Sequence, residues 1–374
     1  MTGGAGGPVI IEARRTPIGT AGRALAGISA ADLAAPVLAD VAGRVSRAPA
    51  EVVLGNCMGP GGDVARVATL AAGLPLEVPA ATVDRQCASG LAAIEVGSRL
   101  VDDDHWPVLA GGVESASTAP WRFWPPVGDA EPVRYERAPF APAAIGDPDM
   151  GLAADLLVEQ RGIGRERQDE YAARSHRLAW AAHEQGLLAD ELVPVGNLDR
   201  DQRLRPGMTA ARMARMPPAF RDGGTVTAGT ACGINDGAAV VALAPASAGL
   251  PGLRVLATAS AGVDPRLPGL GLVPAVRSAL ARAGLGVDDL DVIEVNEAFA
   301  GQVLACYDEL GIDPGRVCVQ GGALALGHPW GASGAVLVVR LFSQLVRQGR
   351  GRYGLAAIAA GGGQGTAVVV ETCR

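Results

Sequence analysis

Two distant parts of the chain repeat one another, and this repeat constrains the fold more than any other feature. Residues 87–91 read CASGL and residues 331–335 read GASGA, and each run opens an apolar stretch of helical character. Upstream of each lies a short apolar run that ends in asparagine, at Asn56 and at Asn296. Downstream of each lies an apolar run that ends in two glycines. Three matched segments in the same order predict a duplicated fold, against the alternative of chance similarity in Ala/Gly-rich sequence.

Within each half, strand-like runs alternate with helix-like runs, which predicts an α/β fold with mixed sheets. We expect one half at 1–117, the other at 251–374, and an inserted loop domain at 118–250. In the insert, residues 121–143 are rich in proline and aromatic residues and are predicted to form an irregular loop. Residues 165–184 mix Arg with Glu and Asp and predict a helix with a solvated face, and the Gly/Thr-rich run 223–237 returns the chain to the core.

Composition excludes several classes of protein. Hydrophobic residues make up 49% of the 374, which supplies a large core, and the net charge of −7 argues against nucleic-acid binding. The chain has no lysine, so Schiff-base and P-loop chemistry are excluded. Its six cysteines show no disulfide framework and no CxxC pair of a zinc site. The sequence shows neither a secretory signal pattern nor an apolar run of about 18 residues, so we expect a cytoplasmic protein without a membrane span.

Cys87 is the first candidate for chemistry. It lies between a β-like run (residues 81–83) and an apolar helix, and small residues after it permit a sharp turn. A cysteine at a helix N-terminus lies at the positive end of the helix dipole, which favours the thiolate. The pattern fits a nucleophile, and it also fits a buried structural cysteine.

Three further positions accompany Cys87. His328 lies in a glycine-rich turn before a helix, where it can act as a base, an oxyanion donor or a packing residue; the other histidines (His105, His176 and His183) lie in polar stretches that we expect to be exposed. Asn296 follows an apolar strand and can orient a water, hold a carbonyl or cap a turn. The glycine run 361–365 precedes a strand and not a helix, which favours close backbone approach to a ligand over phosphate binding.

Taken together, these segments resemble the thiolase family over essentially the whole chain. The resemblance rests on motifs in a fixed order: DRQCASG (84–90), GGVES (111–115), GTVTAG (224–229), GINDG (233–237), NEAF (296–299) and GHP (327–329). It implies two βαβαβαββ halves that form a five-layered α/β/α/β/α core with an inserted loop domain. It also implies acyl-CoA thioesters as substrates, no bound cofactor or metal, and a homodimer or homotetramer.

The resemblance also implies roles for residues. Cys87 would attack the thioester and carry the acyl group, and His328 would activate Cys87. His328 would also polarise the carbonyl of the second substrate, with a water held by Asn296. The N–H groups of Cys87 and Gly361 would form a second oxyanion hole. The loop domain would bind coenzyme A, and the substrate-binding positions fall on Met150, Arg205, Phe220, Cys232 and Phe299.

At one position the sequence departs from the family in a way that bears on chemistry. Thiolases carry a second reactive cysteine just before the glycine run, as the acid/base at the substrate α-carbon, and Ala359 occupies that position. Asp149 replaces a histidine before Met150, and Thr-Ala-Cys (230–232) replaces Asn-Ala-Ser, which predicts an altered substrate pocket. Cys232 could replace the missing proton carrier, although the family's geometry places it along pantetheine.

The leading hypothesis is therefore thiolytic cleavage of a 3-ketoacyl-CoA, or the reverse Claisen condensation, through acyl-Cys87. The alternatives are acyl transfer to an amine, alcohol or thiol, which needs no α-carbanion, decarboxylative condensation, and a non-catalytic acyl-CoA-binding protein.

Overall fold

In the computed structural model, which describes residues 6–373, nine strands form one path whose two halves mirror each other. From the middle outwards, the first half orders its strands β1 (Val9–Arg15), β8 (Asn235–Ala244), β5 (Val108–Ser115), β3 (Glu51–Gly55) and β4 (Ala80–Val83). The second half orders them β9 (Gly252–Gly262), β12 (Gln364–Cys373), β11 (Tyr353–Ala360) and β10 (Val292–Val295). The halves join where β1 pairs with β9, and a short strand β2 (Gly19–Thr20) pairs with β8.

The repeated sequence segments occupy equivalent places in this sheet. β3 and β10, which end just before Asn56 and Asn296, lie next to and parallel to β5 and β11. β5 contains the pair Gly111-Gly112, and β11 ends just before the pair Gly361-Gly362. The central strands β8, β1, β9 and β12 run antiparallel to their neighbours. The predicted duplicated α/β fold with mixed sheets is confirmed.

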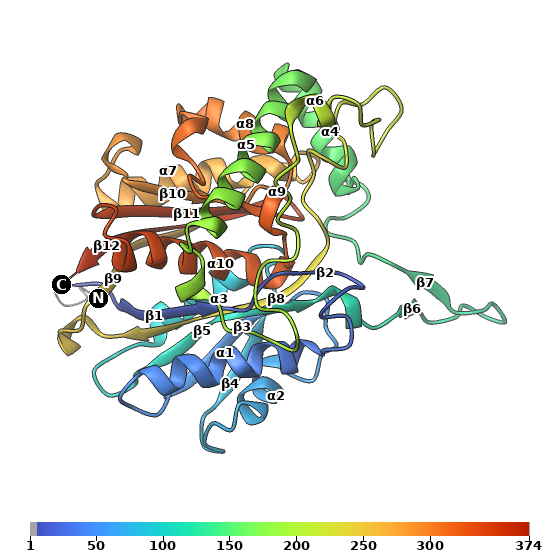
Figure 1. Cartoon of the computed structure of the whole chain (residues 1–374). Coiled ribbons are helices and arrows are strands. Elements are labelled where there is room, and N and C mark those ends of the chain that lie inside the picture. The colour runs from blue at the N-terminus through green and yellow to red at the C-terminus, as the bar shows by residue number, and fades with distance from the viewer. Residues whose placement is uncertain (1–5, 374) are drawn as a thin grey trace.

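Helices divide the molecule into five layers (Figure 1). The outer layer of the first half contains α1 (Ala30–Arg44) and α2 (Val64–Ala71), and that of the second half contains α7 (Leu272–Ala283) and α8 (Ala300–Leu310). Between the two halves of the sheet lie α3 (Ser89–Leu100) and α10 (Trp330–Phe342). Alternate residues of β8 face opposite layers, since Val240 packs in the cluster with α1 and Val241 in the cluster with α10.

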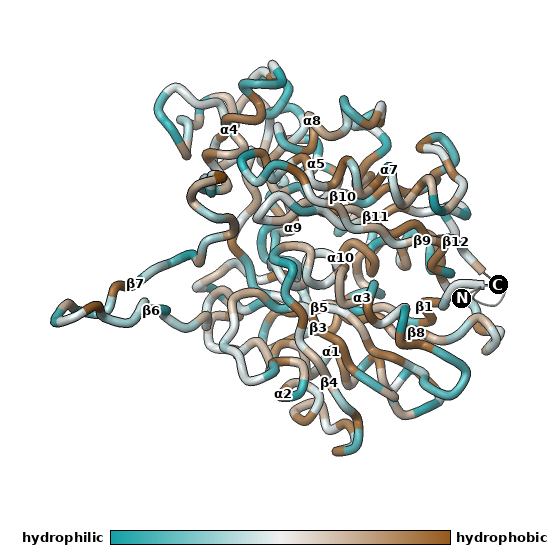
Figure 2. Tube along the Cα trace, turned by 180° about the vertical axis from the view of Figure 1, so that it is seen from behind, coloured by the Kyte–Doolittle hydropathy of each residue, from teal (hydrophilic) through white to brown (hydrophobic). Residues whose placement is uncertain are grey.

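Of the two helices in the middle layer, α10 is the more deeply buried. Residues 331–342 of α10 are all buried, which is why residues 331–339 contain no charged side chain. The hydrophobic stretches in the tube of Figure 2 run through these inner strands and helices.

Glycines at repeated positions let α3 and α10 touch backbone to backbone. A Cβ on Gly90 would lie 2.8 Å from the Gly331 carbonyl oxygen, and a Cβ on Gly334 would lie 2.5 Å from the Leu91 nitrogen. The shared CASG and GASG sequences therefore mark the crossing of the two central helices. This crossing brings the segment that begins at Cys87 against the segment that follows His328.

The insert contains more regular structure than its sequence predicts. Residues 121–143, expected to be an irregular loop, contain a hairpin of β6 (Arg122–Trp124) and β7 (Val133–Tyr135) that projects from the body (Figures 1 and 2). Its strands are only three residues long, below the length at which alternation is readable. Helix α4 (Met150–Arg161) precedes α5 (Arg165–Glu184), which has the predicted bounds, and α6 (Ala210–Met213) follows. Strand β8 lies within the range predicted for the insert and is a central core strand.

Short helical turns complete the chain. They are η1 (Ala116–Thr118), η2 (Ala189–Glu191), η3 (Ala246–Ala248), η4 (Pro268–Gly271), η5 (Val287–Asp289), η6 (Pro314–Arg316), α9 (Ala323–Leu326) and the π-helical turn η7 (Ser343–Arg347). No helix in residues 6–373 is long and apolar enough to cross a bilayer.

Candidate active site

Cys87 lies in a constrained turn between β4 and α3. Gln86 has φ of 50°, a left-handed conformation that a side-chain-bearing residue rarely adopts. The Ser89 hydroxyl holds the turn, because it donates to the Gln86 carbonyl at 2.6 Å and accepts the Arg85 N–H at 2.8 Å. The main-chain N–H groups of Cys87 and of Gly361, from the loop after β11, lie near the Cys87 sulfur and act to lower its pKa. Two main-chain donors thus lie where the resemblance predicted an oxyanion hole.

The resting state of Cys87 differs from the sequence-based expectation. Burial, and next the negative charge of Glu114, raise the pKa of the Cys87 thiol to about 12, although the two amides act in the opposite direction. The expected thiolate is therefore wrong for the protein without substrate, because desolvation outweighs the helix N-terminus. A base must take the thiol proton before Cys87 can attack.

His328 has the protonation state that such a base needs. Burial lowers the pKa of His328 to about 3, so the imidazole is neutral at physiological pH. Its Nδ1 lies 2.6 Å from the Ser333 hydroxyl oxygen, and that hydroxyl donates to the Pro329 carbonyl at 3.1 Å. We infer that Nδ1 carries the proton and donates it to Ser333, which leaves the Nε2 lone pair free to accept a proton.

Asn296 faces the same imidazole. Its side-chain Nδ2 lies 3.4 Å from His328 Nε2, and its main-chain N–H donates to the Ala357 carbonyl within β11. The His328 N–H in turn donates to the Asn235 side chain at 2.9 Å. Three segments from both halves therefore fix the Asn296–His328 pair.

A buried carboxylate anchors the loop after Asn296. Glu297 accepts hydrogen bonds from the Tyr171 hydroxyl at 2.9 Å, the Ser175 hydroxyl at 2.6 Å and the Leu324 N–H at 3.2 Å. Two of these donors come from α5 and one from α9, so Glu297 joins the insert to the segment that carries His328.

A narrow apolar cavity opens beside Cys87. Its wall combines the end of β11, where Ala359 lies, with α4, η4 and the loop before α8; its lining residues are Cys87, Met150, Ala153, Ala154, Leu157, Pro268, Gly269, Ala298, Phe299, Gln302 and Ala359. Its apolar walls suit an acyl chain attached to the Cys87 sulfur. The side chain of Ala359 has no ionisable group, so the β11 wall supplies no proton.

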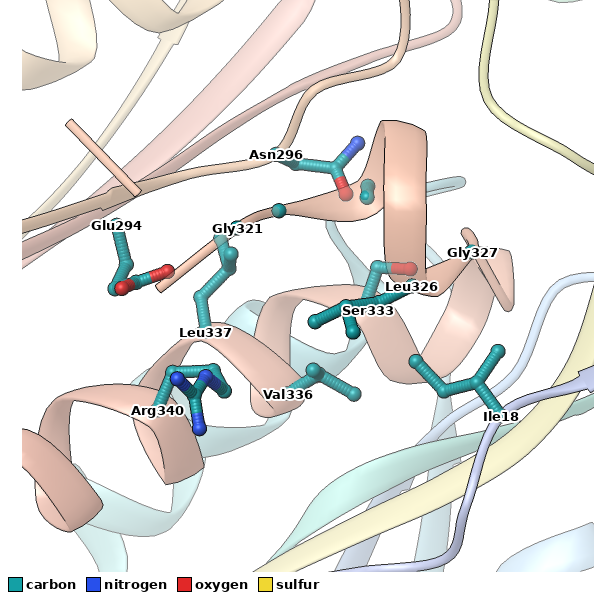
Figure 3. Close-up of a pocket in the computed structure, with 12 residues that line it drawn as sticks. Ile18, Glu294, Asn296, Gly321, Leu326, Gly327, Ser333, Val336, Leu337 and Arg340 are labelled. Atoms are coloured by element: carbon teal, nitrogen blue, oxygen red, sulfur yellow. The ribbon is translucent and has the colours of Figure 1, made fainter. Parts of the chain in front are cut away.

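A second cavity is lined by Asn296 and by Ser333, the hydroxyl partner of His328 (Figure 3). Asn296, Ser333, Glu294 and Arg340 all line it, and Cys87 does not. Burial raises the pKa of Glu294 to about 7, with Arg340 acting in the opposite direction. Because Cys87 does not line this cavity, an acyl group on the Cys87 sulfur is assigned to the other cavity.

The structure brings four of the five predicted substrate-binding residues to one region. Met150 and Phe299 line the Cys87 cavity, and the Phe220 ring packs edge-on against Phe299 at 5.7 Å between ring centroids. The Cys232 N–H donates to the Ala298 carbonyl at 2.9 Å, on the same loop. Arg205 is exposed and is not among the residues that line the cavity.

Two expectations about neighbouring polar residues change. His176 was expected in an exposed stretch but is 3% exposed, because it lies on the inner face of α5, and burial lowers its pKa to about 4. Asp149, which replaces a histidine of the family, caps α4 by accepting the Gly151 N–H at 2.9 Å. The exchange at position 149 is therefore compatible with a helix-capping role.

Sequence reasoning missed three residues that shape the site. The Phe140 ring packs on Gly361, where a Cβ would lie 2.6 Å from it, so the aromatic loop covers the main chain at Gly361. Ser333 orients His328. In the sequence, the only sign of this contact was that Ser333 lies five residues after His328, in the helix that follows it. Glu114 accepts from Asn56, Cys57 and the Gly331 N–H, which joins the two halves below Cys87. In the sequence, the only sign of this role was that Glu114 belongs to the GGVES motif.

No cluster of potential metal ligands occurs within residues 6–373. The six cysteines are free thiols. The candidate site therefore consists of thiol, imidazole, amide and main-chain groups.

Comparison with known proteins places these features in one family. Sequence models of the thiolase N-terminal and C-terminal domains match residues 8–247 and 251–372. An acetyl-CoA acetyltransferase of Pseudomonas aeruginosa is 42% identical, and a beta-ketoadipyl-CoA thiolase of Escherichia coli is 41% identical; each alignment covers 97% of this chain and 98% of the relative. The crystal structure of the Bacillus anthracis acetyl-CoA acetyltransferase is similar, with a TM-score of 0.90 and 38% identity over 98% of this chain and 99% of that one.

Proposed function

The chain belongs to the thiolase family and is an acyltransferase enzyme, and from this premise we propose that it cleaves 3-ketoacyl-CoA thioesters with coenzyme A, or runs the reverse Claisen condensation, through an acyl group on Cys87. One observation carries the proposal. The N–H groups of Cys87 and Gly361 act on the Cys87 sulfur, which lines an apolar cavity, and an acyl carbonyl attached to that sulfur needs such donors nearby.

The first step is activation of Cys87. His328 Nε2 accepts the thiol proton, and the thiolate attacks the 3-keto carbonyl. Negative charge then develops on the carbonyl oxygen, and these main-chain N–H groups stabilise it. The bond between C2 and C3 breaks, which leaves an acyl group on Cys87 and a carbanion at the α-carbon of the departing acetyl-CoA.

The departing thioester needs its own stabilisation, because the carbanion is an enolate with charge on the thioester oxygen. His328, protonated at Nε2 after the first step, and Asn296 Nδ2 supply hydrogen-bond donors at 3.4 Å from one another. The carbanion also needs a proton. Coenzyme A then attacks acyl-Cys87 and carries the acyl group away.

The insert supplies the proposed coenzyme A site. Cys232, Phe220 and Met150 lie around the loop 298–299 next to the Cys87 cavity, so a thioester that reaches Cys87 passes along them. Arg205 lies on the exposed side of the insert, where a cationic group suits the phosphates of coenzyme A. A homodimer or homotetramer in the cytoplasm remains our prediction for its assembly and location.

The test is formation of the acyl-enzyme. We expect acetyl-CoA to add one acetyl group to the intact chain, and Cys87→Ala to abolish the adduct because it removes the sulfur that carries the acyl group. Mass spectrometry of the protein and its peptides measures this. Cys373→Ala is the matched control and should keep the adduct, since Cys373 lies at the far end of β12. An adduct that persists in Cys87→Ala would contradict the proposal.

A second candidate is acyl transfer from Cys87 to an amine, alcohol or thiol. Ala359 favours it, because such transfer forms no carbanion and needs no acid/base at the α-carbon. Cleavage of acetoacetyl-CoA by free coenzyme A separates the two candidates. Turnover within about 1–10³ per second supports thiolysis; acetyl-Cys87 that forms without any such cleavage supports transfer to another acceptor.

A further inference from the structure

The cleavage proposed above requires a proton donor at the α-carbon, and Ala359 cannot serve. This inference rests on that proposed function. A candidate must carry an exchangeable proton, lie next to the Cys87 cavity and differ from His328, which already holds the proton of Cys87.

Cys232 is held beside the cavity by main-chain bonds. Residues 230–232 run antiparallel to 298–300: Ala231 bridges Phe299, the Cys232 N–H donates to Ala298 at 2.9 Å, and the Ala300 N–H donates to Thr230 at 2.8 Å. Ala298 and Phe299 both line the cavity that contains Cys87 and Ala359. The thiol is therefore on a rigid segment that borders the reaction site.

The hydrogen bonding of the cysteines singles out two of them. Four thiols contact a protein acceptor: Cys57 donates to Glu114, Cys306 to Gly269, Cys318 to Val295, and Cys373 weakly to Gly252. Within residues 6–373, no hydrogen bond is made by the sulfur of Cys87 or of Cys232 to a protein acceptor. Both are half-buried, so each has an S–H group available to a bound molecule.

The charges around Cys232 suit a group that gives up a proton and regains it. Burial, and next the Cys87 charge, raise the pKa of the Cys232 thiol to about 12, so it rests as a protonated acid. The Arg203 guanidinium packs on Gly233, where a Cβ would lie 2.3 Å from it, and it acts to lower the Cys232 pKa. Arg203 Nε is buried and has no partner in the described residues. A thiolate at Cys232 would have this cation beside it.

We propose that Cys232 is the second catalytic thiol, which protonates the α-carbon of the departing acetyl-CoA in place of a group at position 359. In cleavage, the Cys232 S–H proton goes to the carbanion as the C2–C3 bond breaks, which leaves a thiolate at Cys232. Coenzyme A then gives its thiol proton to Cys232 and attacks acyl-Cys87. The Cys87 thiolate leaves and recovers its proton from His328, so every proton is returned.

The experiment compares two reactions in the full-length protein and its variants. Thiolysis of acetoacetyl-CoA requires a proton donor for the α-carbon. Exchange of labelled coenzyme A into acetyl-CoA proceeds through acetyl-Cys87 alone and forms no α-carbanion. We expect Cys232→Ala to lower kcat of thiolysis by about 10²–10⁴-fold. Exchange should fall by less than about ten-fold, because coenzyme A ionises appreciably near pH 8 by itself.

Two further variants separate chemistry from packing. Cys232→Ser keeps the size and a hydrogen-bonding group but not the acidity, so it should be impaired like Cys232→Ala. The double variant Cys232→Ala with Ala359→Cys should regain at least about ten-fold in thiolysis, because residue 359 lines the same cavity. Deuterium exchange into the methyl group of acetyl-CoA, followed by NMR, should fall and recover in parallel.

The outcomes are distinguishable. Thiolysis by Cys232→Ser near the wild-type rate, or a loss confined to KM, would assign Cys232 to substrate binding and overturn the inference. Failure of the unsubstituted protein to cleave acetoacetyl-CoA would instead refute the proposed cleavage itself, and this inference with it. Equal thermal unfolding midpoints of the variants show that the comparison concerns folded protein.

Discussion

At the scale of single residues, burial sets the chemistry of the site more strongly than position in the sequence. The pKa of Cys87 is raised to about 12 and that of His328 lowered to about 3, so the reactive form at physiological pH is a neutral thiol–imidazole pair. Such a pair loses its base only when His328 is protonated, near pH 3, and loses its thiol proton only near pH 12.

We therefore expect the rate of acetyl-Cys87 formation to stay within about two-fold between pH 5 and pH 9. The measurement is single-turnover release of coenzyme A from acetyl-CoA across that range. An ordinary imidazole would instead cause the rate to fall as the pH decreases through about 6.5. A decrease of the rate through about pH 6.5 would contradict the lowered pKa of His328.

At the scale of elements, the crossing of α3 and α10 positions the site. Gly90 is in contact with the backbone of α10, and α3 begins two residues after Cys87. A methyl group at position 90 would push the two central helices apart, and residues 331–342 of α10 are buried and have no free space to move into.

Gly90→Ala should therefore reduce the free energy of unfolding by about 1–3 kcal/mol and slow acetyl-Cys87 formation. Gly43→Ala is the control, since a Cβ there meets nothing within 4 Å on the exposed side of α1. Gly43→Ala should leave the free energy of unfolding unchanged or raise it by up to about 1 kcal/mol. Denaturant unfolding measures the stability of both variants. Equal effects of the two substitutions would show that the close helix contact at Gly90 does not contribute to stability.

At the scale of the whole molecule, a buried network of charges joins the two halves and the insert. Arg15 of β1 donates to Asp201 at 2.7 Å and to Glu191 at 2.8 Å, and Arg340 of α10 donates to the other oxygen of Glu191 at 2.6 Å. All four side chains are at most 2% exposed. Loss of one partner leaves an uncompensated charge in the core.

Arg340→Met should consequently destabilise the protein by about 3–5 kcal/mol, seen as a lower midpoint in denaturant. Arg167→Met, which breaks an exposed pair with Asp308, should cost less than about 1 kcal/mol. If Arg340→Met is as mild as Arg167→Met, the network does not contribute to holding the parts together.

The amount that could be predicted differs between the fold and the site. The repeated CASG and GASG segments predicted the duplication, because the same close helix contact requires the same glycine in each half. The hairpin in 121–143 was missed, since two strands of three residues carry no readable alternation. Roles for Cys87, His328, Asn296 and Gly361 stay predictions that the geometry supports.

The sequence alone determined the duplicated α/β fold and which motifs carry reactive groups, because apolar periodicity and small residues at fixed places depend only on local order. Only the tertiary structure decided how those groups behave. The Cys87 thiol rests protonated, His176 is buried, Ser333 orients His328, and Cys232 lies on a segment that pairs with the wall of the Cys87 cavity. Each of these depends on which distant segments desolvate or contact a side chain, and no local pattern in the chain contains that information.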